Sequence, residues 1–355
     1  MFRSRSDVIA AAATAAVLLT TGACAKAADD PQPVGGDAGQ QVQSAAAGDL
    51  CTADKYNGGV PKLDLATTTV GFAQSEKEAN PFRITETESI KAEAAKRGIK
   101  LITTNAQSDL NKEIADIQSM IAQGAKALII SPLNSEGLDP ALKAAQAAKV
   151  PIMTIDRLLT SKTACVDYIG WIGSDFVDQG ERAADAMMTA TGDKGEVAIL
   201  LGASGVNVTV DRTKGFKDQL AAKGSALKVV AEQTADFTRE KGRAVTEQLI
   251  SANPGITAIY AENDEMALGA VAALKAAGKK AGDIKIITID GTKGAVQGIV
   301  DGWVAGVIES NPRFGPLAFQ ALDDFYSGKG VPAKTIIADK EYTAANAAAE
   351  LANAY

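Results

Sequence analysis

The sequence has 355 residues, of which 46% are hydrophobic and 22% are charged, and its formal net charge is −7. This length accommodates two domains with substantial cores, and the acidic balance, without any basic block, argues against nucleic acid as a partner. The chain contains no histidine, which excludes histidine metal sites, Ser-His-Asp and Cys-His nucleophile pairs and histidine general bases.

The N-terminus has the pattern of a secretory signal peptide. Two arginines precede the apolar stretch 8–19. This stretch is too short to form a permanent transmembrane helix across the ~30 Å hydrocarbon core of a bilayer. The letters "GAC" at 22–24 resemble a bacterial lipoprotein cleavage box, although Thr21 stands where leucine is usual. We predict that 1–23 is a signal peptide and that a lipid on Cys24 anchors the protein to the outer face of the cytoplasmic membrane. Plain secretion into the periplasm is the alternative.

The segment after the lipidation site is expected to be a flexible tether. Residues 25–50 contain no aromatic side chain and are rich in Gly, Ala, Gln and Asp. Such a segment cannot bury enough apolar surface to offset the entropy of ordering. We predict that the lipid-anchored tether extends over 24–64 and connects the membrane to a folded body.

Two further cysteines, Cys51 and Cys165, remain in the chain. An extracytoplasmic compartment permits disulfides, and two cysteines allow one pairing. We expect a disulfide that joins the start of the body to the segment just after Asp156 and Arg157. Two separate thiols are the alternative.

Strand and helix patterns alternate along the body from Thr67 onward. Apolar or β-rich runs predict strands at 67–73, 99–104, 126–132, 151–156, 168–175, 195–202, 227–233, 255–261 and 283–290. Helical patterns follow the first strand up to residue 96 and then occur at about 110–124, 137–148, 175–191, 209–223, 238–252, 264–277 and 293–301. We predict an α/β fold with two doubly wound parallel sheets of about five or six strands, since one sheet of nine or more is less common at this length.

Polar side chains follow many of these strands, at the sheet edge where ligands of open parallel sheets bind. The segments are "QSEKEANPFR" (74–83), "NAQSD" (105–109), Asp156-Arg157, "AENDEM" (261–266) and "DGTKG" (290–294), with Phe82 and Phe237 nearby. Carboxylate and amide oxygens accept hydrogen bonds from sugar hydroxyls, arginine donates two, and aromatic faces cover the C–H side of a sugar ring. The pattern favours a hydroxyl-rich ligand.

Several of these residues also have a purely structural interpretation. Asp290 precedes Gly291 and could form a turn, Asn263 could cap a helix, and Arg157 could pair with a carboxylate. Their convergence from several strands favours a binding cleft.

Six ordered segments carry a family resemblance: "VGFAQSEKEANPF" (70–82), "TIDR" (154–157), "DRTKGF" (211–216), "DFTREKG" (236–242), "NDEMALGA" (263–270) and "DGTKGAVQGIVDG" (290–302). Together they resemble the periplasmic sugar-binding proteins of ABC importers, of the ribose-binding type. Residues 81–99 and 315–332 are most similar to the galactofuranose-binding branch, in which arginine takes a position that an aromatic residue holds in ribose binders.

The resemblance implies a type I periplasmic binding protein, in which two lobes joined by a three-crossover hinge close around one monosaccharide. It places the N-terminal lobe at 65–173 plus 311–338 and the C-terminal lobe at 174–310 plus 339–355. The implied sugar contacts are Asn80, Phe82, Arg83, Gln107, Ser108, Asp156, Arg157, Arg212, Phe237, Asn263, Asp290 and Ser310. Gln107 is an alternative to Ser108, and "ESNP" at 309–312 departs from the family, so Glu309 is an alternative to Ser310.

The same resemblance implies delivery of a galactofuranose-like sugar, a pentose or a hexose to an ABC transporter permease and its ATPase. It implies a monomer without cofactor, metal or enzymatic activity. Glucose and galactose binders of the family have a calcium loop, and "DLNKEIADIQ" (109–118) invites that interpretation. Ile114 stands where the loop needs glycine, so we interpret the segment as a helix.

Three other classes of function remain as alternatives. A sugar-sensing co-receptor would have the same sequence features as a transport protein. A regulator of the lac-repressor type would need an N-terminal helix-turn-helix, where the signal peptide and the tether stand. An enzyme would need a nucleophile–base pair or a Gly-x-Gly-x-x-Gly after the first strand, and neither is visible.

Overall fold

The computed structural model describes residues 42–45 and 48–355. The predicted signal peptide and the lipidation of Cys24 lie outside these residues. In the described part of the chain, no helix combines the length and the apolar character that crossing a bilayer requires.

The first sheet contains seven strands within the described residues, in the order β1-β12-β6-β5-β4-β2-β3. Every neighbouring pair is parallel except β1 and β12, which are antiparallel. The strands are β1 (Val42–Ala45), β2 (Thr69–Gln74), β3 (Lys100–Asn105), β4 (Ala127–Ser131), β5 (Ile152–Ile155), β6 (Trp171–Gly173) and β12 (Lys334–Ile337).

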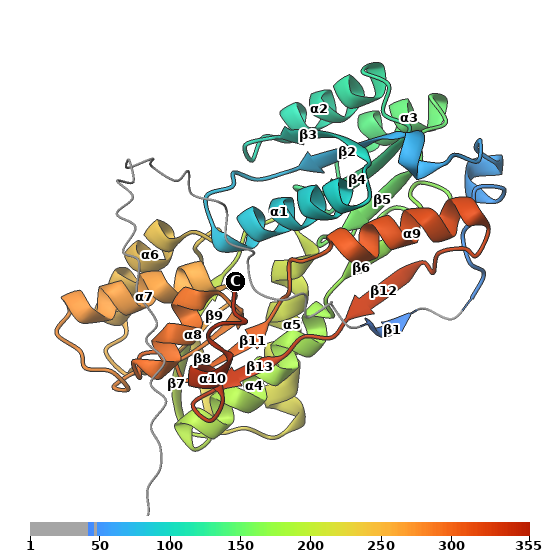
Figure 1. The fold of residues 1–355 in the computed structure, drawn as a ribbon. Coiled ribbons are helices and arrows are strands. Elements are labelled where there is room, and N and C mark those ends of the chain that lie inside the picture. Colours follow the sequence, from blue (N-terminus) through green and yellow to red (C-terminus); the bar gives the residue numbers. More distant parts are fainter. Residues whose placement is uncertain (1–41, 46–47) are drawn as a thin grey trace, which may run out of the picture. The chain divides into compact units, whose positions relative to one another are not determined.

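Helices cover both faces of this sheet (Figure 1). One face shares its core with α1 and α9, and the other face packs against α2 and α3. These helices are α1 (Pro81–Lys96), α2 (Leu110–Ala122), α3 (Asp139–Ala147) and α9 (Gly315–Ser327), and two short 3₁₀ helices, Tyr56–Gly58 and Leu65–Thr67, precede β2. We call this sheet with its helices the first lobe.

The second sheet contains six strands within the described residues, in the order β13-β11-β10-β9-β7-β8, and only β13 is antiparallel to its neighbour. Its strands are β7 (Gly195–Leu201), β8 (Leu227–Thr234), β9 (Ile256–Ala261), β10 (Lys285–Asp290), β11 (Gly306–Glu309) and β13 (Glu341–Thr343). Its helices are α4 (Phe176–Thr191), α5 (Asn207–Ala222), α6 (Arg239–Ala252), α7 (Asp264–Ala276), α8 (Lys293–Val300) and α10 (Ala347–Glu350). We call this sheet with its helices the second lobe.

The central strands explain why the sequence shows continuous apolar runs instead of an alternating pattern. Every residue of β4 and of β5 is buried, because helices cover both faces of the sheet. Parallel strands in such a position are rich in valine, isoleucine and leucine. The last residue of β5 is followed directly by Asp156 and Arg157, which the strand therefore holds at the edge of the sheet.

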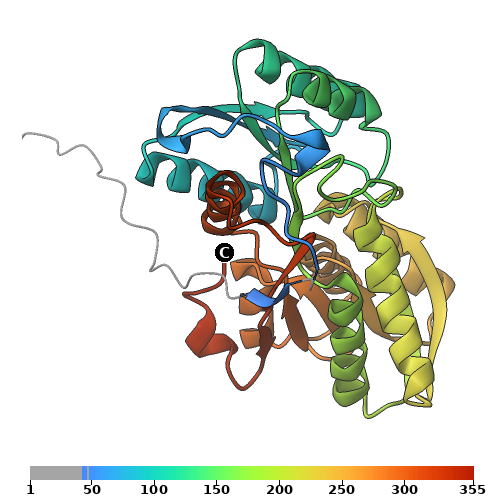
Figure 2. The same cartoon turned by 90° about the vertical axis from the view of Figure 1, so that its right-hand side faces the viewer.

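The chain crosses between the lobes three times: between β6 and α4, between β11 and α9, and between β12 and β13. The second crossing returns the chain to the first lobe, and Figures 1 and 2 both place α9 beside α1, although the two helices are far apart in the sequence. The predicted α/β fold of two doubly wound lobes with three crossovers is confirmed.

The start of the body differs from the expectation. Cys51, Ala53 and Tyr56 are at most 1% exposed and belong to the core of the first lobe. Cys51 forms the expected disulfide with Cys165, and the Tyr56 hydroxyl donates to the carbonyl oxygen of Asp167 at 3.1 Å. The predicted tether, 24–64, is therefore too long at its C-terminal end. Its last part packs into the core of the first lobe through a few apolar side chains, and composition alone does not reveal this packing.

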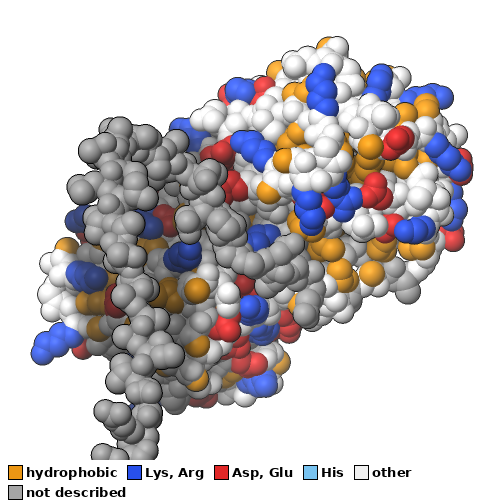
Figure 3. Space-filling model, viewed as in Figure 1, with side chains coloured by type: hydrophobic (Ala, Val, Ile, Leu, Met, Phe, Trp, Pro, Cys, Tyr) orange, Lys and Arg blue, Asp and Glu red, His pale blue; other side chains and the backbone are white. Residues whose placement is uncertain are grey.

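Charged side chains of both signs are interspersed over the face drawn in Figure 3, where the grey atoms leave it visible. Neither sign gathers into a large patch there. The visible part of this face therefore offers no concentrated positive charge to a polyanion.

Candidate functional site

A cavity of about 40 Å³ lies where strand ends of both sheets meet. The first lobe lines it with Glu76, Asn80, Phe82, Arg83, Asp156 and Arg157, and the second lobe with Val208, Arg212, Phe237, Asn263 and Asp290. All of these except Glu76 and Val208 are predicted site residues. The structure therefore brings residues from distant parts of the chain to one place, with polar groups on both sides.

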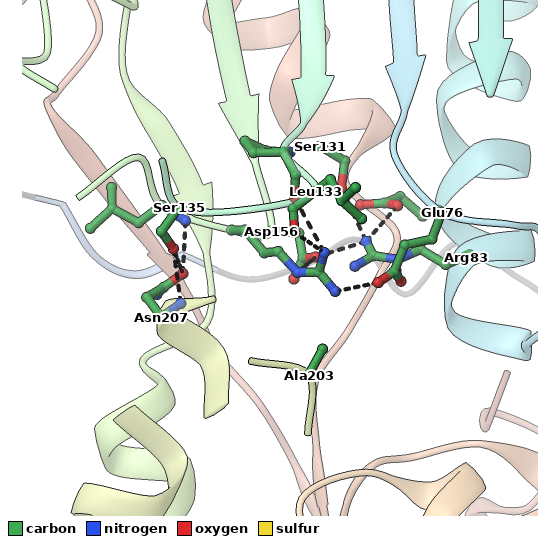
Figure 4. Close-up of polar contacts among 12 residues, drawn as sticks. Glu76, Arg83, Ser131, Leu133, Ser135, Asp156, Ala203 and Asn207 are labelled. Carbon is green, nitrogen blue, oxygen red and sulfur yellow. Dashed lines mark hydrogen bonds and ion pairs between the residues drawn. The ribbon is translucent and has the colours of Figure 1, made fainter. Parts of the chain in front are cut away.

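Glu76 connects the two arginines of the first lobe (Figure 4). Its Oε1 accepts a hydrogen bond from Arg157 Nη2 at 2.7 Å, and its Oε2 accepts one from Arg83 Nε at 2.8 Å. Burial by itself would raise the pKa of Glu76, but the two guanidinium groups outweigh burial and lower the pKa to about 2. Glu76 is thus ionised in the neutral range and fixes the spacing of the two cations.

Arg83 is almost fully buried, and its charge is balanced by more than one carboxylate. Nη1 lies 2.7 Å from Asp156 Oδ2 and donates to Glu86 Oε2 at 2.9 Å. The same nitrogen donates to Ser131 Oγ at 3.0 Å. Burial opposes the charge of Arg83, yet its pKa is raised well above the usual value because Asp156, Glu76 and Glu86 surround it. A ligand that enters the cavity meets a permanent positive charge on this side.

Arg157 is held by the loop that follows β4. Its Nη1 donates to the Leu133 carbonyl oxygen at 2.6 Å, and the Leu133 N–H donates to Glu113 Oε2 at 3.1 Å. Glu113 lies on α2 and is fully buried, and this burial raises its pKa to about 7. The Leu133 peptide therefore links a buried carboxyl to the arginine that lines the cavity.

The second lobe supplies Arg212 from helix α5. Its Nε donates to Gln179 Oε1 at 3.0 Å, and its Nη1 donates to the Glu262 carbonyl oxygen at 2.5 Å. Its Nη2 lies 3.7 Å from Asp290 Oδ1, which is beyond hydrogen-bond distance. Two anchors hold the guanidinium, and Asp290 lies within ion-pair distance of it without a direct hydrogen bond from Nη2.

Three lining residues have positive φ angles, which are unfavourable for residues other than glycine. They are Asp156 (φ 60°), Phe237 (φ 58°) and Asp290 (φ 141°). Such conformations cost about 1–3 kcal/mol each and persist only where the surroundings hold them. At Asp156 the N–H donates to the Ile172 carbonyl oxygen at 2.9 Å, and the carbonyl oxygen accepts from Trp171 Nε1 at 2.9 Å. Strain of this kind clusters at functional sites.

Two asparagines of the lining are helix caps. Asn80 Oδ1 accepts from the Arg83 N–H at 2.9 Å, and Asn263 Oδ1 accepts from the Met266 N–H at 3.0 Å. The interpretation of Asn263 as a cap is confirmed, and it is compatible with a place in the lining. A cap uses the amide oxygen, so the NH₂ group remains as the donor, and that of Asn263 also donates to the Phe237 carbonyl oxygen at 3.3 Å.

Three predicted contacts are not among the described residues that line the cavity. Gln107 and Ser108 are exposed on the loop after β3, where Gln107 donates twice to its neighbour Asn105. Ser310 is buried at the second crossing, where its N–H donates to the Asp290 carbonyl oxygen at 2.8 Å and its carbonyl oxygen accepts from Tyr355. The Ser108 N–H donates to the Ser75 carbonyl oxygen at 2.9 Å, and Ser310 Oγ lies 3.4 Å from Ser174 Oγ, so each of the three residues has partners outside the described lining.

Two lining residues were not predicted. Glu76 lies in "QSEKEANPFR", but the sequence does not distinguish it from Glu78, because the path of a loop decides which carboxylate turns inward. Val208 lies in the first turn of α5, and an apolar residue there carries no signal of a binding role.

The lining is suited to reversible binding of a polyhydroxylated molecule. Its carboxylates accept hydrogen bonds, its guanidinium and amide groups donate them, and Phe82 and Phe237 offer apolar ring faces. The segment 109–118 is the N-cap and body of α2, as the helical interpretation predicts. Among the described residues, no group of three or more Cys, Asp or Glu side chains is arranged to hold a metal ion.

Comparison with known proteins gives consistent similarities. The family described as "periplasmic binding protein domain" matches residues 70–330. The ribose import binding protein of Bacillus subtilis (strain 168) is 39% identical over 271 residues, which are 76% of this chain and 85% of that protein. The galactofuranose-binding protein of Escherichia coli (strain K12) is 35% identical over 274 residues, which are 76% of this chain and 85% of that protein.

Among solved structures, one similar protein is the periplasmic binding protein component of the arabinose ABC transporter from Shewanella sp. ANA-3, bound to α- and β-L-arabinofuranose. Its TM-score is 0.77 at 36% sequence identity, and the match covers 81% of this chain and 95% of that chain.

Proposed function

The chain belongs to the periplasmic binding protein family, and we propose that it captures one monosaccharide between its lobes and delivers it to the permease of an ABC importer. The family works outside the cytoplasm. The similar proteins described above are named for ribose, galactofuranose and arabinose, and two of the three names include import or transport.

The two-sided lining of the cavity is the observation that carries this proposal. The first lobe presents five of the polar lining side chains and the second presents three, so an open form would make only part of the contacts with a sugar. Closure would engage both sets and exclude water, which strengthens each hydrogen bond. Hinge closure around a ligand is the general motion of periplasmic binding proteins. We propose 65–173 plus 311–338 and 174–310 plus 339–355 as the two moving bodies.

We propose a furanose as the ligand class. Arg83 follows Phe82 and adds a second guanidinium to the first lobe, beside Arg157. Both guanidinium groups already donate to protein acceptors, and the N–H groups that these bonds leave over would donate to the exocyclic hydroxyl groups of a furanose. A galactofuranose-binding relative and a structure with bound arabinofuranose support the same class.

The proposal includes a location and a state of assembly. A lipid on Cys24 would hold the monomeric protein at the outer face of the cytoplasmic membrane, near the permease. The composition of residues 25–50 supports a tether of this kind. The protein would act as a carrier without enzymatic activity, as a member of a family of binding proteins whose relatives serve import.

A panel of monosaccharides and their methyl glycosides, which lock the furanose or pyranose ring, tests the proposal. Saturation with a ligand at about 100 times its Kd stabilises a protein by about 2.7 kcal/mol, so a furanose should raise the Tm by several degrees. Calorimetry should then give a one-to-one complex that Arg157→Ala weakens at least 100-fold. The absence of a Tm shift with every sugar of the panel would contradict the proposal, and stronger binding of the pyranosides would contradict the ligand class.

A further inference from the structure

The two lobes contact each other directly at a place that does not belong to the cavity lining. Ser135 lies in the loop after β4 of the first lobe, and Asn207 is the first residue of α5 in the second lobe. Figure 4 shows these two side chains together, apart from the cluster around Glu76 and Arg83. Both are buried, with 5% and 7% of their surface exposed.

Four hydrogen bonds connect the lobes here. The Asn207 N–H donates to Ser135 Oγ at 2.9 Å, and the Ser135 N–H donates to the Gly205 carbonyl oxygen at 3.1 Å. Asn207 Oδ1 accepts from the Leu158 N–H at 3.1 Å and from Ser135 Oγ at 3.3 Å. All four bonds join an atom of one lobe to an atom of the other, so none of them survives a separation of the lobes at this place.

The orientation of the Asn207 amide is determined within its own lobe. Its Nδ2 donates to Asp211 Oδ2 at 3.2 Å, one helical turn further along α5. Because the nitrogen faces Asp211, the oxygen faces the first lobe. The acceptor is therefore preorganised for Leu158 and Ser135 before the lobes meet.

The N-terminus of α5 has no cap of its own. Its N-cap residue is Val206, whose side chain cannot accept a hydrogen bond. The first N–H groups of a helix need acceptors from outside the helix, and the Ser135 hydroxyl of the other lobe supplies one. Val206 and Val208 also pack into a core cluster formed mainly by the first lobe, so apolar contact accompanies the hydrogen bonds.

We propose that Ser135, Leu158, Gly205 and Asn207 form a closure clasp, a set of positioning residues that favour the closed form without touching the sugar. The inference rests on the proposed function. The loop that carries Ser135 also carries the Leu133 carbonyl that holds Arg157, and α5 carries Arg212. The clasp thus aligns the cavity groups of one lobe with those of the other.

A clasp of this kind has a characteristic effect on binding. The apparent Kd of a ligand equals its intrinsic Kd divided by the fraction of binding-competent protein. Loss of the clasp lowers that fraction by the same factor for every sugar. A residue in contact with the sugar would change different sugars by different factors.

Calorimetry with two sugars that the wild type binds tests the clasp. Asn207→Ala removes two acceptor contacts, and net values near 1 kcal/mol per hydrogen bond predict a Kd up to about 30-fold higher for both sugars. Ser135→Ala should act in the same direction, and Ser135→Thr, which keeps a hydroxyl, should restore most of the affinity. Asn346→Ala is the matched control, because Asn346 makes its hydrogen bonds to Thr343 and Glu341 within the second lobe, and it should leave Kd within twofold.

Small-angle X-ray scattering adds a readout without sugar, in which Asn207→Ala should have a larger radius of gyration than the wild type. An unchanged Kd in Asn207→Ala, or factors that differ between the two sugars, would overturn the clasp. If the wild type binds no sugar, the proposed function is overturned. The clasp is then tested by scattering alone, and equal radii of gyration for Asn207→Ala and the wild type would overturn it.

Discussion

Glu76 and Arg157 form a 2.7 Å ion pair between residues that follow two different strands of the first lobe, β2 and β5. The second oxygen of Glu76 binds Arg83. The carboxylate therefore organises one side of the cavity before any ligand is present, and a sugar meets charges whose positions are already determined.

Glu76→Gln tests this organisation. The amide keeps the shape of the side chain but removes the charge, and Arg83 and Arg157 are only 4% and 2% exposed, so water cannot replace it. We expect the free energy of unfolding to fall by about 2–4 kcal/mol and the sugar Kd to rise at least tenfold. Glu88→Gln, at an exposed position of α1, is the control and should change neither quantity in denaturant titrations and calorimetry.

Stability should decrease as pH rises from about 4.5 to about 7. Burial raises the pKa of four carboxyl groups to about 7: Glu113, Glu262, Asp264 and Asp339. In this window the folded protein retains protons that the unfolded chain releases, so the free energy of unfolding falls with pH, by about 3–4 kcal/mol for each fully shifted group. The pKa of Glu76, about 2, acts in the opposite direction, and its contribution is lost as pH falls from about 4.5 towards 2.

Thermal unfolding at pH 5 and pH 8 measures this dependence, and the Tm should be higher at pH 5. Glu113→Gln keeps an acceptor for the Leu133 N–H and needs no ionisation, so it should raise stability at pH 8 and leave it nearly unchanged at pH 5. A wild-type Tm that is higher at pH 8 would contradict the assignment of these carboxyls as neutral buried groups.

The disulfide between Cys51 and Cys165 should contribute strongly to stability. It joins residues 114 positions apart, and removal of a native disulfide typically costs 2–5 kcal/mol, about 2–4 °C in Tm per kcal/mol at this chain length. The variant with Cys51→Ser and Cys165→Ser should therefore have a Tm lower by roughly 5–15 °C. Its sugar Kd should stay within twofold, because neither cysteine lines the cavity; a large loss of affinity would assign the bridge a role in binding.

Trp171→Phe should weaken binding more than it weakens the fold. The indole Nε1 donates to the carbonyl oxygen of Asp156, whose left-handed conformation depends on such support. Phenylalanine keeps most of the packing and loses the donor. We expect the sugar Kd to rise about three- to tenfold, for a loss of about 1 kcal/mol, while Trp303→Phe, a substitution outside the cavity lining, leaves the Kd unchanged.

Most of the body could be predicted from the sequence, because hydrophobic periodicity reports burial directly. The apolar run before Asp156 identified β5, and the stripe of isoleucines between Asp109 and Gly124 identified α2. Periodicity did not reveal the strands after residue 301, since short strands such as β11 and β13 contain too few residues to show a period.

The site could be predicted where a strand dictates the position of a side chain. Asp156 follows the last residue of β5 and Asp290 is the last residue of β10, so the direction of each strand places them. In a loop, the chain direction does not determine where a side chain lies. Glu76 was therefore missed, and Gln107 was expected in the cavity but donates a hydrogen bond to Asn105. The contact between Ser135 and Asn207 was also invisible, because it depends on how two lobes meet.

A crystal structure of the protein with a bound furanose tests the central claim most directly. The account predicts one sugar in the cavity, with hydroxyl groups within about 3.2 Å of Asp156 or Arg157 on one side and of Arg212 or Asp290 on the other. A sugar that contacts only one lobe, or that occupies another place on the molecule, would contradict it.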